Sequence, residues 1–185
     1  MSAKYDRVTE ILSPFSGLNY VPKDVLENAQ VRGTKVHAAC ESIIRDLGDW
    51  NDDDEISGYI ESFKKWWNKD WKTLAIEQRF QCEDLKITGQ IDFIYQDPMM
   101  GNVLTDIKTS SKEGKTWPLQ GSAYRYLAGK NGLTINNIMF LRLRRDGQYP
   151  FVHMYEDNFP MFLKCVDVYR FFYQKGKHEP EQQCA

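Results

Sequence analysis

The chain has 185 residues with a formal net charge of −2, and 42% of its residues are hydrophobic. This length and composition fit a single domain, residues 1–185, with a core of its own. The near-neutral charge argues against a protein that holds nucleic acid by bulk positive charge, and the absence of a long apolar run argues against a membrane protein. Because the N-terminus also lacks secretory character, we expect a soluble, intracellular (cytoplasmic) protein with no membrane partner.

The four cysteines are spread along the chain without a Cys-x-x-Cys pair, so their spacing indicates neither a disulfide framework nor a zinc site. We predict that Cys40, Cys82 and Cys165 are small apolar residues in or near the core. Cys184 belongs to a polar stretch, residues 176–185, which we predict to be a flexible tail.

Residues 1–32 are expected to form a helical lead-in to the domain. Within them, residues 5–20 predict a short helical or irregular opening followed by a loop, and Pro22 is a favourable first residue for a helix over residues 23–30. Glycine is unfavourable inside helices, so Gly33 is predicted to interrupt this one.

A second helix is predicted over residues 35–47, with Thr34 as its N-cap and Gly48 at its end. Apolar residues recur along it at the spacing of an amphipathic helix, and His37 lies on the flank of that apolar stripe. Two interpretations of His37 are open at this point. It is either a hydrogen-bonded or exposed helical histidine, or a ligand of a metal ion.

The next segments are predicted as loop, helix and strand. Residues 49–55 are acidic and are expected to form a solvated loop. Aromatic side chains recur at helical spacing over residues 58–71, and such a stripe is usually part of the core. Residues 72–81 alternate with a period of two and predict the first strand of a sheet. Glu77 lies on this strand, either as an ordinary surface glutamate or as part of a site shared with the neighbouring strand.

Two further strands are predicted on either side of a turn. The turn is marked by Asp97-Pro98 and Gly101-Asn102, so the strands are expected to pair as a hairpin. One face of the first strand is predicted to carry Ile87, Gly89, Ile91, Phe93 and Tyr95, and the other Thr88, Gln90 and Asp92. In the second strand, Val103, Thr105 and Ile107 alternate against Leu104, Asp106 and Lys108.

The polar residues of this hairpin predict a metal site. Asp106 and Lys108 are two residues apart, which places a carboxylate and an ammonium on one face, and Asp92 can reach that face from the neighbouring strand. Two close carboxylates repel each other unless a cation lies between them, and a hard divalent cation with oxygen ligands is the usual solution. A lysine beside such an ion can orient or activate a water molecule.

The remainder of the chain predicts a helix, two strands and a last helix. The first of these helices starts near Trp117-Pro118 and places Gln120 and Tyr124, four residues apart, on one face. The later elements are predicted over residues 135–144 (strand), 149–155 (strand) and 158–174 (amphipathic helix).

The sequence Gly89-Gln90-Ile91-Asp92, followed by Asp106-Ile107-Lys108, resembles the core motif of the PD-(D/E)XK nuclease superfamily, in its RecB-like exonuclease branch. Asp92 matches the first acidic position, Asp106 the second, and Lys108 the lysine. The proline that names the motif is replaced by Ile91, a departure that touches no ligand. Gln120 and Tyr124 are similar to the Gln-x-x-x-Tyr motif that follows the lysine in this branch.

The resemblance covers residues 33–155 and implies an α/β fold with a restriction-endonuclease-like αβββαβ core, in which helices flank a central mixed sheet. It also implies that the histidine of a Gly-x-x-x-His helix, here His37, reaches the metal and that Glu77 completes the site. The implied ligands of one or two Mg²⁺ or Mn²⁺ ions are His37, Glu77, Asp92, Asp106 and the backbone carbonyl of Ile107. We expect no iron–sulfur cluster, since the late group of cysteines that holds one in some relatives is missing.

The implied activity is that of a metal-dependent deoxyribonuclease, and we expect an exonuclease of phage or of DNA repair and recombination. DNA is the expected partner, and no recombination or replication protein can be named as a second one. The implied catalytic residues are Asp92, Asp106, Lys108 and Glu77. Contacts to nucleic acid are expected from Gln120, Tyr124, Thr109, Ser110 and Lys112.

Two other functions are open from the sequence. One is an inactive DNA-binding or assembly module on the same fold, which would bind DNA without cleaving it. The other is a small metalloprotein with a different substrate, which would have a closed pocket instead of an open groove lined by lysine and arginine. Lys108, Lys112, Lys115 and the run from Arg142 to Arg145 are candidates for phosphate contacts, and a solvated surface is the alternative for each.

Overall fold

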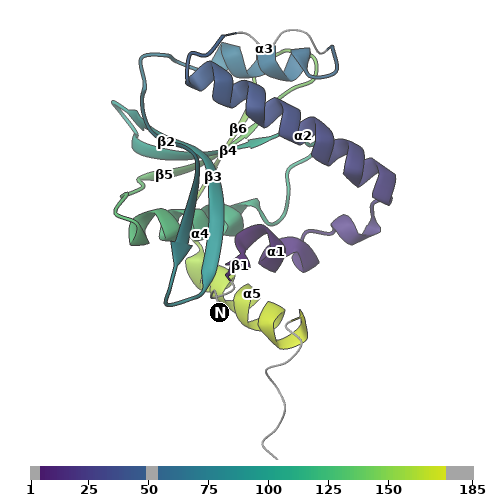
Figure 1. Cartoon of the computed structure of the whole chain (residues 1–185), viewed down its shortest axis with the longest axis vertical. Coiled ribbons are helices and arrows are strands. Elements are labelled where there is room, and N and C mark those ends of the chain that lie inside the picture. The colour runs from purple at the N-terminus through teal and green to yellow at the C-terminus, as the bar shows by residue number, and fades with distance from the viewer. Residues whose placement is uncertain (1–4, 49–53, 174–185) are drawn as a thin grey trace, which may run out of the picture.

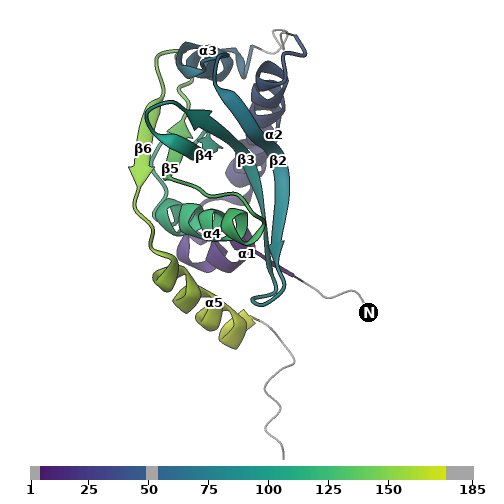
Figure 2. The same ribbon diagram turned by 90° about the vertical axis from the view of Figure 1, so that its left-hand side faces the viewer.

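The computed structural model describes residues 5–48 and 54–173. The predicted tail with Cys184, and residues 49–53 of the predicted acidic loop, lie outside the described residues. The described chain is α/β, with a mixed six-stranded sheet that has helices on both faces (Figures 1 and 2). In this part of the chain no helix is long and apolar enough to cross a membrane.

The sheet contains β1 (Asp6–Arg7), β2 (Lys72–Cys82), β3 (Ile87–Asp97), β4 (Gly101–Lys108), β5 (Asn137–Arg142) and β6 (Phe151–Tyr155). The strand order is β1-β3-β4-β5-β6, and β2 also pairs with β3. Strands β3 and β4 form the predicted antiparallel hairpin, β5 runs parallel to β4, and β6 is antiparallel to β5. Strand β1, which pairs in parallel with the start of β3, is not predicted from the sequence pattern.

The helices are α1 (Val8–Leu12), α2 (Lys23–Ile44), α3 (Ser57–Trp66), α4 (Trp117–Lys130) and α5 (Phe159–Tyr173), with short 3₁₀ turns η1 (Ser13–Phe15) and η2 (Leu18–Tyr20). Helices α1, α4 and α5 cover one face of the sheet, and α2 and α3 cover the other (Figure 2). Each face buries its own apolar cluster. Leu127 is in the first cluster and Phe63 in the second. As predicted, Cys40 and Cys82 are buried and Cys165 is partly buried.

Helix α2 is one continuous helix of 22 residues, so the predicted interruption at Gly33 is wrong. A single glycine inside a helix costs only about 1 kcal/mol, and packing of the later turns on the sheet outweighs that cost. Thr34 is therefore not an N-cap. Its hydroxyl donates to the carbonyl of Gln30, 3.0 Å away, within the same helix. The helix also ends earlier than predicted, at Ile44, and Leu47 is exposed.

The aromatic stripe that follows residue 57 lies in the core, as predicted, but the helix that carries it is shorter than predicted. Helix α3 ends at Trp66, and the backbone of Trp67 is already extended. Trp71 lies beyond the helix and stacks on Tyr95, with ring centroids 4.3 Å apart. The spacing of the aromatic residues thus predicts the burial of this segment better than it predicts the extent of the helix.

Halfway along β2 and β3, the side chains that faced one apolar cluster begin to face the other. The predicted strict alternation of the strand residues is therefore wrong. In β3, Ile91 packs in the cluster under α4, whereas Phe93, two residues later, packs in the cluster under α3. In β2, Glu77 lies opposite this point, between the pairs Ile76↔Phe93 and Gln78↔Ile91, and has a left-handed φ of 46°. Such a φ costs a residue other than glycine about 1–2 kcal/mol, and here it accompanies the change of face.

Candidate metal centre

The candidate site lies where β3 and β4 stop pairing. Their ladder ends at the pair Phe93↔Thr105, and β1 pairs only with the first two residues of β3. On this edge, residues 89–92 have no strand partner in the described part of the chain. Asp92 Oδ2 accepts a hydrogen bond of 2.6 Å from the backbone N–H of Ile107 in β4. The Asp92 carboxylate is therefore fixed at the point where the two strands separate.

Helix α2 brings His37 to this point, because the neighbouring residue Val36 and the following turn of the helix are buried on the sheet. His37 Nε2 lies 3.0 Å from the carbonyl oxygen of Ile107, and His37 Nδ1 lies 3.3 Å from Asp92 Oδ1. The same Nδ1 lies 3.9 Å from Glu77 Oε1 on β2. His37, Glu77 and Asp92, called the ligand trio below, each offer one ligand atom, and these atoms lie within 4.8 Å of one another.

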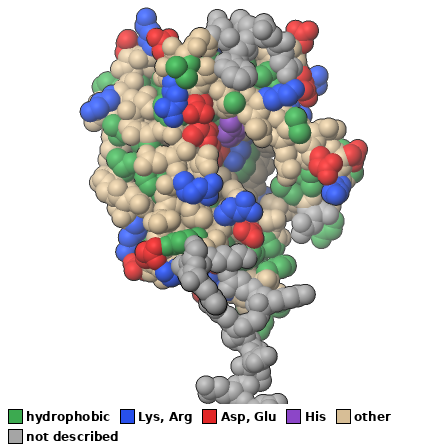
Figure 3. Space-filling view, viewed as in Figure 1, with side chains coloured by type: hydrophobic (Ala, Val, Ile, Leu, Met, Phe, Trp, Pro, Cys, Tyr) green, Lys and Arg blue, Asp and Glu red, His purple; other side chains and the backbone are tan. Residues whose placement is uncertain are grey.

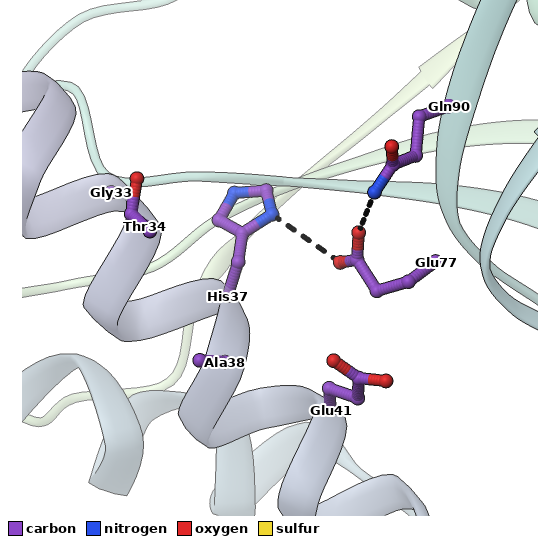
Figure 4. Close-up of a pocket in the computed structure, with 7 residues that line it drawn as sticks. All are labelled: Gly33, Thr34, His37, Ala38, Glu41, Glu77 and Gln90. Atoms are coloured by element: carbon purple, nitrogen blue, oxygen red, sulfur yellow. Dashed lines mark hydrogen bonds and ion pairs between the residues drawn. The ribbon is translucent and has the colours of Figure 1, made fainter.

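His37 and Glu77 line a cavity of about 420 Å³, called the metal cavity below. Their side chains turn toward each other, and Glu41 lies on the next turn of α2 (Figure 4). Figure 3 shows a hollow on this side of the molecule, with a histidine beside acidic side chains at its edge. Gln90 Nε2 donates to Glu77 Oε2 at 2.7 Å, and Arg79 Nη2 donates to Gln90 Oε1 at 2.8 Å. These two hydrogen bonds fix the orientation of the Glu77 carboxylate.

On the α4 side of β4, Asp106 and Lys108 form the expected carboxylate–ammonium pair. Asp106 is only 2% exposed, and its Oδ2 lies 2.6 Å from Lys108 Nζ. Gln120 Nε2 donates to Asp106 Oδ1 at 2.9 Å and to the hydroxyl of Tyr124 at 3.1 Å. Lys108 Nζ also donates to Gln120 Oε1 at 3.3 Å and lies 5.3 Å from the centre of the Phe140 ring. The lysine is thus held by a carboxylate, an amide and an aromatic ring.

The structure brings the residues of the predicted site together as two adjacent groups. The ligand trio forms one group on the α2 side, and Asp106 with Lys108 forms the other on the α4 side. Ile107 joins them, because its N–H binds the trio's aspartate, its carbonyl lies beside the trio's histidine, and its two chain neighbours are Asp106 and Lys108. Asp106, a predicted metal ligand, is not among the residues whose ligand atoms lie within 4.8 Å of one another.

The charges explain how the side chains of the site are arranged. Burial lowers the pKa of His37, but the Asp92 and Glu77 carboxylates outweigh burial and raise this pKa well above its usual value. Burial raises the pKa of Asp92, but the neighbouring His37 and Lys108 outweigh it and bring this pKa below its usual value. Burial also raises the pKa of Asp106 to about 6, and Lys108 offsets that effect only in part. The carboxylates around His37 therefore favour a positive charge at this position.

The residues present fit a hard divalent cation. Carboxylate oxygens and a backbone carbonyl are ligands that Mg²⁺ prefers, and an imidazole nitrogen among them also suits Mn²⁺. Apart from its ion pair with Lys108, Asp106 Oδ2 is buried without a hydrogen-bond partner in the described structure. Since a histidine ligand must be neutral, metal binding would compete with protonation of His37.

The residues predicted to contact nucleic acid lie in two different environments. Gln120 and Tyr124 are buried, and Gln120 donates hydrogen bonds both to Asp106 and to the hydroxyl of Tyr124. That these two residues contact nucleic acid stays a prediction. Thr109 and Ser110 line a second cavity at the end of β4, and Lys112 is exposed on the loop that follows.

Three further residues beside the site, Gln90, Arg79 and Glu41, are not among the predicted site residues. Their spacing from the predicted residues is the signal that indicates them. Glu41 follows His37 by four residues in a helix, so both lie on one face. Gln90 precedes Asp92 by two residues in a strand, and Arg79 follows Glu77 by two.

Comparison of the chain with models of known protein families finds no match, and comparison with curated proteins finds none either. The residues of the site and their geometry therefore carry the functional assignment.

Proposed function

We propose that the protein is a metal-dependent deoxyribonuclease that hydrolyses phosphodiester bonds of DNA. The observation that carries this proposal is the convergence of the ligand trio from α2, β2 and β3 beside Ile107, directly next to the buried Asp106–Lys108 pair. Hydrolysis of a phosphodiester needs an activated water and a means of stabilising negative charge on the phosphate. A divalent cation and a fixed ammonium in neighbouring positions provide both.

The order of the elements supports the same proposal. Helix α2 comes before the antiparallel strands β2, β3 and β4, which are followed by α4 and then by β5, parallel to β4. This is the αβββαβ order of the restriction-endonuclease-like core, and the hairpin motif resembles the same superfamily. Within that superfamily the motif favours an exonuclease of phage or of DNA repair and recombination.

The chain's own residues have distinct parts in the proposed reaction. The ligand trio, Asp106 and the carbonyl of Ile107 would hold Mg²⁺ or Mn²⁺, which when bound polarises the scissile phosphate and lowers the pKa of a bound water. Lys108 Nζ is placed to donate a hydrogen bond to the attacking water or to the phosphate oxygen on which charge develops. Asp106 and Gln120 keep that ammonium group in position.

The first test is the degradation of end-labelled linear DNA, single- and double-stranded, and of a closed circle, with Mg²⁺, Mn²⁺ or EDTA. We expect loss of the linear DNA only when a metal ion is present. Lys108→Ala should reduce the rate by about a hundredfold or more, because it removes a fixed donor to the developing charge. Lys69→Ala is the matched control, since Lys69 is exposed and has no charged partner among the described residues.

Each outcome of this assay has a different meaning. Loss of linear DNA with the circle spared would identify an exonuclease, and cleavage of the circle an endonuclease. Cleavage by Lys108→Ala at the wild-type rate would show that the assignment of this lysine is wrong. Binding of DNA without cleavage in either metal would replace the nuclease by an inactive binding module on the same fold.

A further inference from the structure

A second cavity, of about 490 Å³, lies at the end of β4. Because arginines dominate its lining, we call it the arginine pocket, and these arginines are Arg32, Arg142, Arg144 and Arg145. Thr109 and Ser110, the two residues after Lys108, line it as well. In α2, Arg32 lines the arginine pocket and the next residue, Gly33, lines the metal cavity. The two cavities are therefore neighbours on either side of one turn of α2.

The arginine pocket is built on the same backbone as the candidate metal centre. Arg142 pairs with Lys108 in the parallel ladder of β4 and β5, and the N–H of Leu143 donates to the carbonyl of Lys108 at 2.8 Å. The loop after β5 is tied to α3, because the N–H of Arg144 donates to Ser62 Oγ at 3.1 Å. The position of the pocket is thus fixed relative to the proposed catalytic lysine.

The pocket has more positive than negative charge. Its one carboxylate, Asp146, pairs with Arg144 through hydrogen bonds of 3.0 and 2.5 Å. Arg32, Arg142 and Arg145 have no carboxylate partner among the described residues. The Nε atoms of Arg32 and Arg142 are also buried without a hydrogen-bond partner. Three guanidinium groups of the pocket therefore have no counter-charge among the described residues, and a bound anion would supply one.

Two of the arginines are held in position without being neutralised. Arg142 Cζ lies 4.1 Å from the centre of the Phe151 ring, and its Nη1 donates to the carbonyl of Ser111 at 2.9 Å. Arg32 Cζ lies 5.9 Å from the centre of the Tyr59 ring. Stacking on an aromatic ring leaves the edge of a guanidinium group free, and that edge matches the oxygens of a phosphate.

We propose that the arginine pocket binds a phosphate group of the nucleic-acid strand whose scissile bond lies at the metal centre. This inference rests on the proposed nuclease function and adds to it the anchor that holds the substrate. Because Thr109 directly follows Lys108, a phosphate in the pocket and one at the metal centre belong to nearby nucleotides. The phosphate is either an internal one of the backbone or one at the end of the strand.

The test is the affinity of a fluorescent single-stranded oligonucleotide, measured in EDTA by anisotropy at several salt concentrations. The variant is Arg32→Gln/Arg145→Gln, which removes two charges and leaves the stacked Arg142 in place. The matched control is Lys69→Gln/Lys164→Gln, two exposed lysines without charged partners among the described residues. Thermal denaturation followed by circular dichroism verifies that all three proteins are folded.

We expect the arginine variant to bind about tenfold more weakly than the control variant, with a smaller dependence of affinity on salt. Oligonucleotides with a 5′-phosphate, a 3′-phosphate or neither distinguish the sources of the phosphate. If the arginine variant loses the same affinity for all three oligonucleotides, the pocket binds an internal phosphate. If it loses affinity only for the oligonucleotide with one particular phosphorylated end, the pocket binds that terminal phosphate.

The proposal that the pocket binds a phosphate and the proposal that the protein is a nuclease can be disproved independently. Equal affinity of the arginine variant and the control variant, or no binding by the wild-type chain at low salt, overturns the inference about the pocket. Absence of metal-dependent cleavage by a wild-type chain that does bind through these arginines would overturn the nuclease and leave the pocket in place.

Discussion

Two buried carboxyl groups belong to this site, those of Asp92 and Asp106. The carboxyl group of Asp106 is the less favourable one to ionise. Burial raises its pKa to about 6, although Lys108 lies 2.6 Å away. In an unfolded chain the pKa of an aspartate is about 3.9. The folded state therefore binds this proton more tightly than the unfolded state, and a bound metal ion would replace the proton as the neutralising charge.

This difference predicts how the stability of the metal-free protein depends on pH. Below about pH 4 the Asp106 carboxyl group is protonated in both states, and its contribution to stability is fully present. As the pH rises through about 6, the folded state loses the proton and the contribution is lost. Between these values the free energy of unfolding should fall, relative to that of Asp106→Asn, by up to about 3 kcal/mol.

Urea unfolding of the wild-type protein and of Asp106→Asn, in EDTA at pH 4.5, 6 and 7.5, measures this difference. Asparagine keeps an oxygen that can accept the hydrogen bond from Gln120. The same pH dependence in both proteins would contradict the raised pKa of Asp106.

Some features of single residues could be predicted from the sequence and others could not. Asp106 and Lys108 share a face because a period of two is a local property of any strand. The left-handed backbone of Glu77 has no such local signal, since residues other than glycine rarely adopt it. The hydrogen bond from Gln120 to Asp106 joins two different elements, which helical spacing alone does not indicate.

At the scale of the element, helix α2 has two halves in different environments. Residues 23–35 are all exposed or only partly buried, and full burial begins at Val36. Figure 1 shows the first half extending away from the sheet. The first half therefore depends on local helix energetics, in which Gly33 is the least favourable residue.

Gly33→Ala should stabilise the protein by about 0.5–1 kcal/mol, because alanine favours a helix and restricts the unfolded chain. An added Cβ would lie 3.9 Å from Thr109 Oγ1, which is an ordinary contact. Thermal denaturation measures the effect. Gly121→Ala is the contrasting variant, since its Cβ would lie 2.3 Å from Ile138 Cγ2, and it should destabilise the protein. A destabilised Gly33→Ala protein would show that position 33 needs the freedom of glycine.

The sequence predicts best those elements in which the spacing of the apolar residues matches the face that is buried. The β3–β4 hairpin and helix α4 are of this kind. The sequence predicts two helices in place of α2 because a glycine is unfavourable in a helix and the packing that outweighs it is not visible in the sequence. The reversal of faces in β2 and β3 has no signal in either strand alone, because both strands change together, opposite Glu77.

At the scale of the whole molecule, the ligand trio joins three elements that are far apart in the sequence. An unfolded chain cannot present these ligands together, so a metal ion that binds them stabilises only the folded protein. We expect Mn²⁺ or Mg²⁺ to raise the melting temperature. At a concentration about 100 times its dissociation constant, the gain is about 2.7 kcal/mol.

Differential scanning calorimetry with and without the metal measures this shift and does not depend on activity. Asp92→Asn should abolish the shift, because it removes a charged ligand and keeps an oxygen that can accept the hydrogen bond from Ile107. Lys69→Ala should keep it. A full shift in Asp92→Asn would place the bound metal elsewhere.

The unlike charges of the two neighbouring cavities have a consequence for the direction of digestion. One cavity is lined by acidic side chains and the other by basic ones, so a strand that occupied both would meet two unlike ends. A nucleic-acid strand also has unlike ends, and reversing it would reverse the sugar on each side of the scissile phosphate. An enzyme that uses both cavities at once should therefore shorten DNA with a single polarity, from the 5′ end or from the 3′ end. The position of the label in the degradation assay shows which, and equal loss from both ends would mean that one strand does not occupy both cavities.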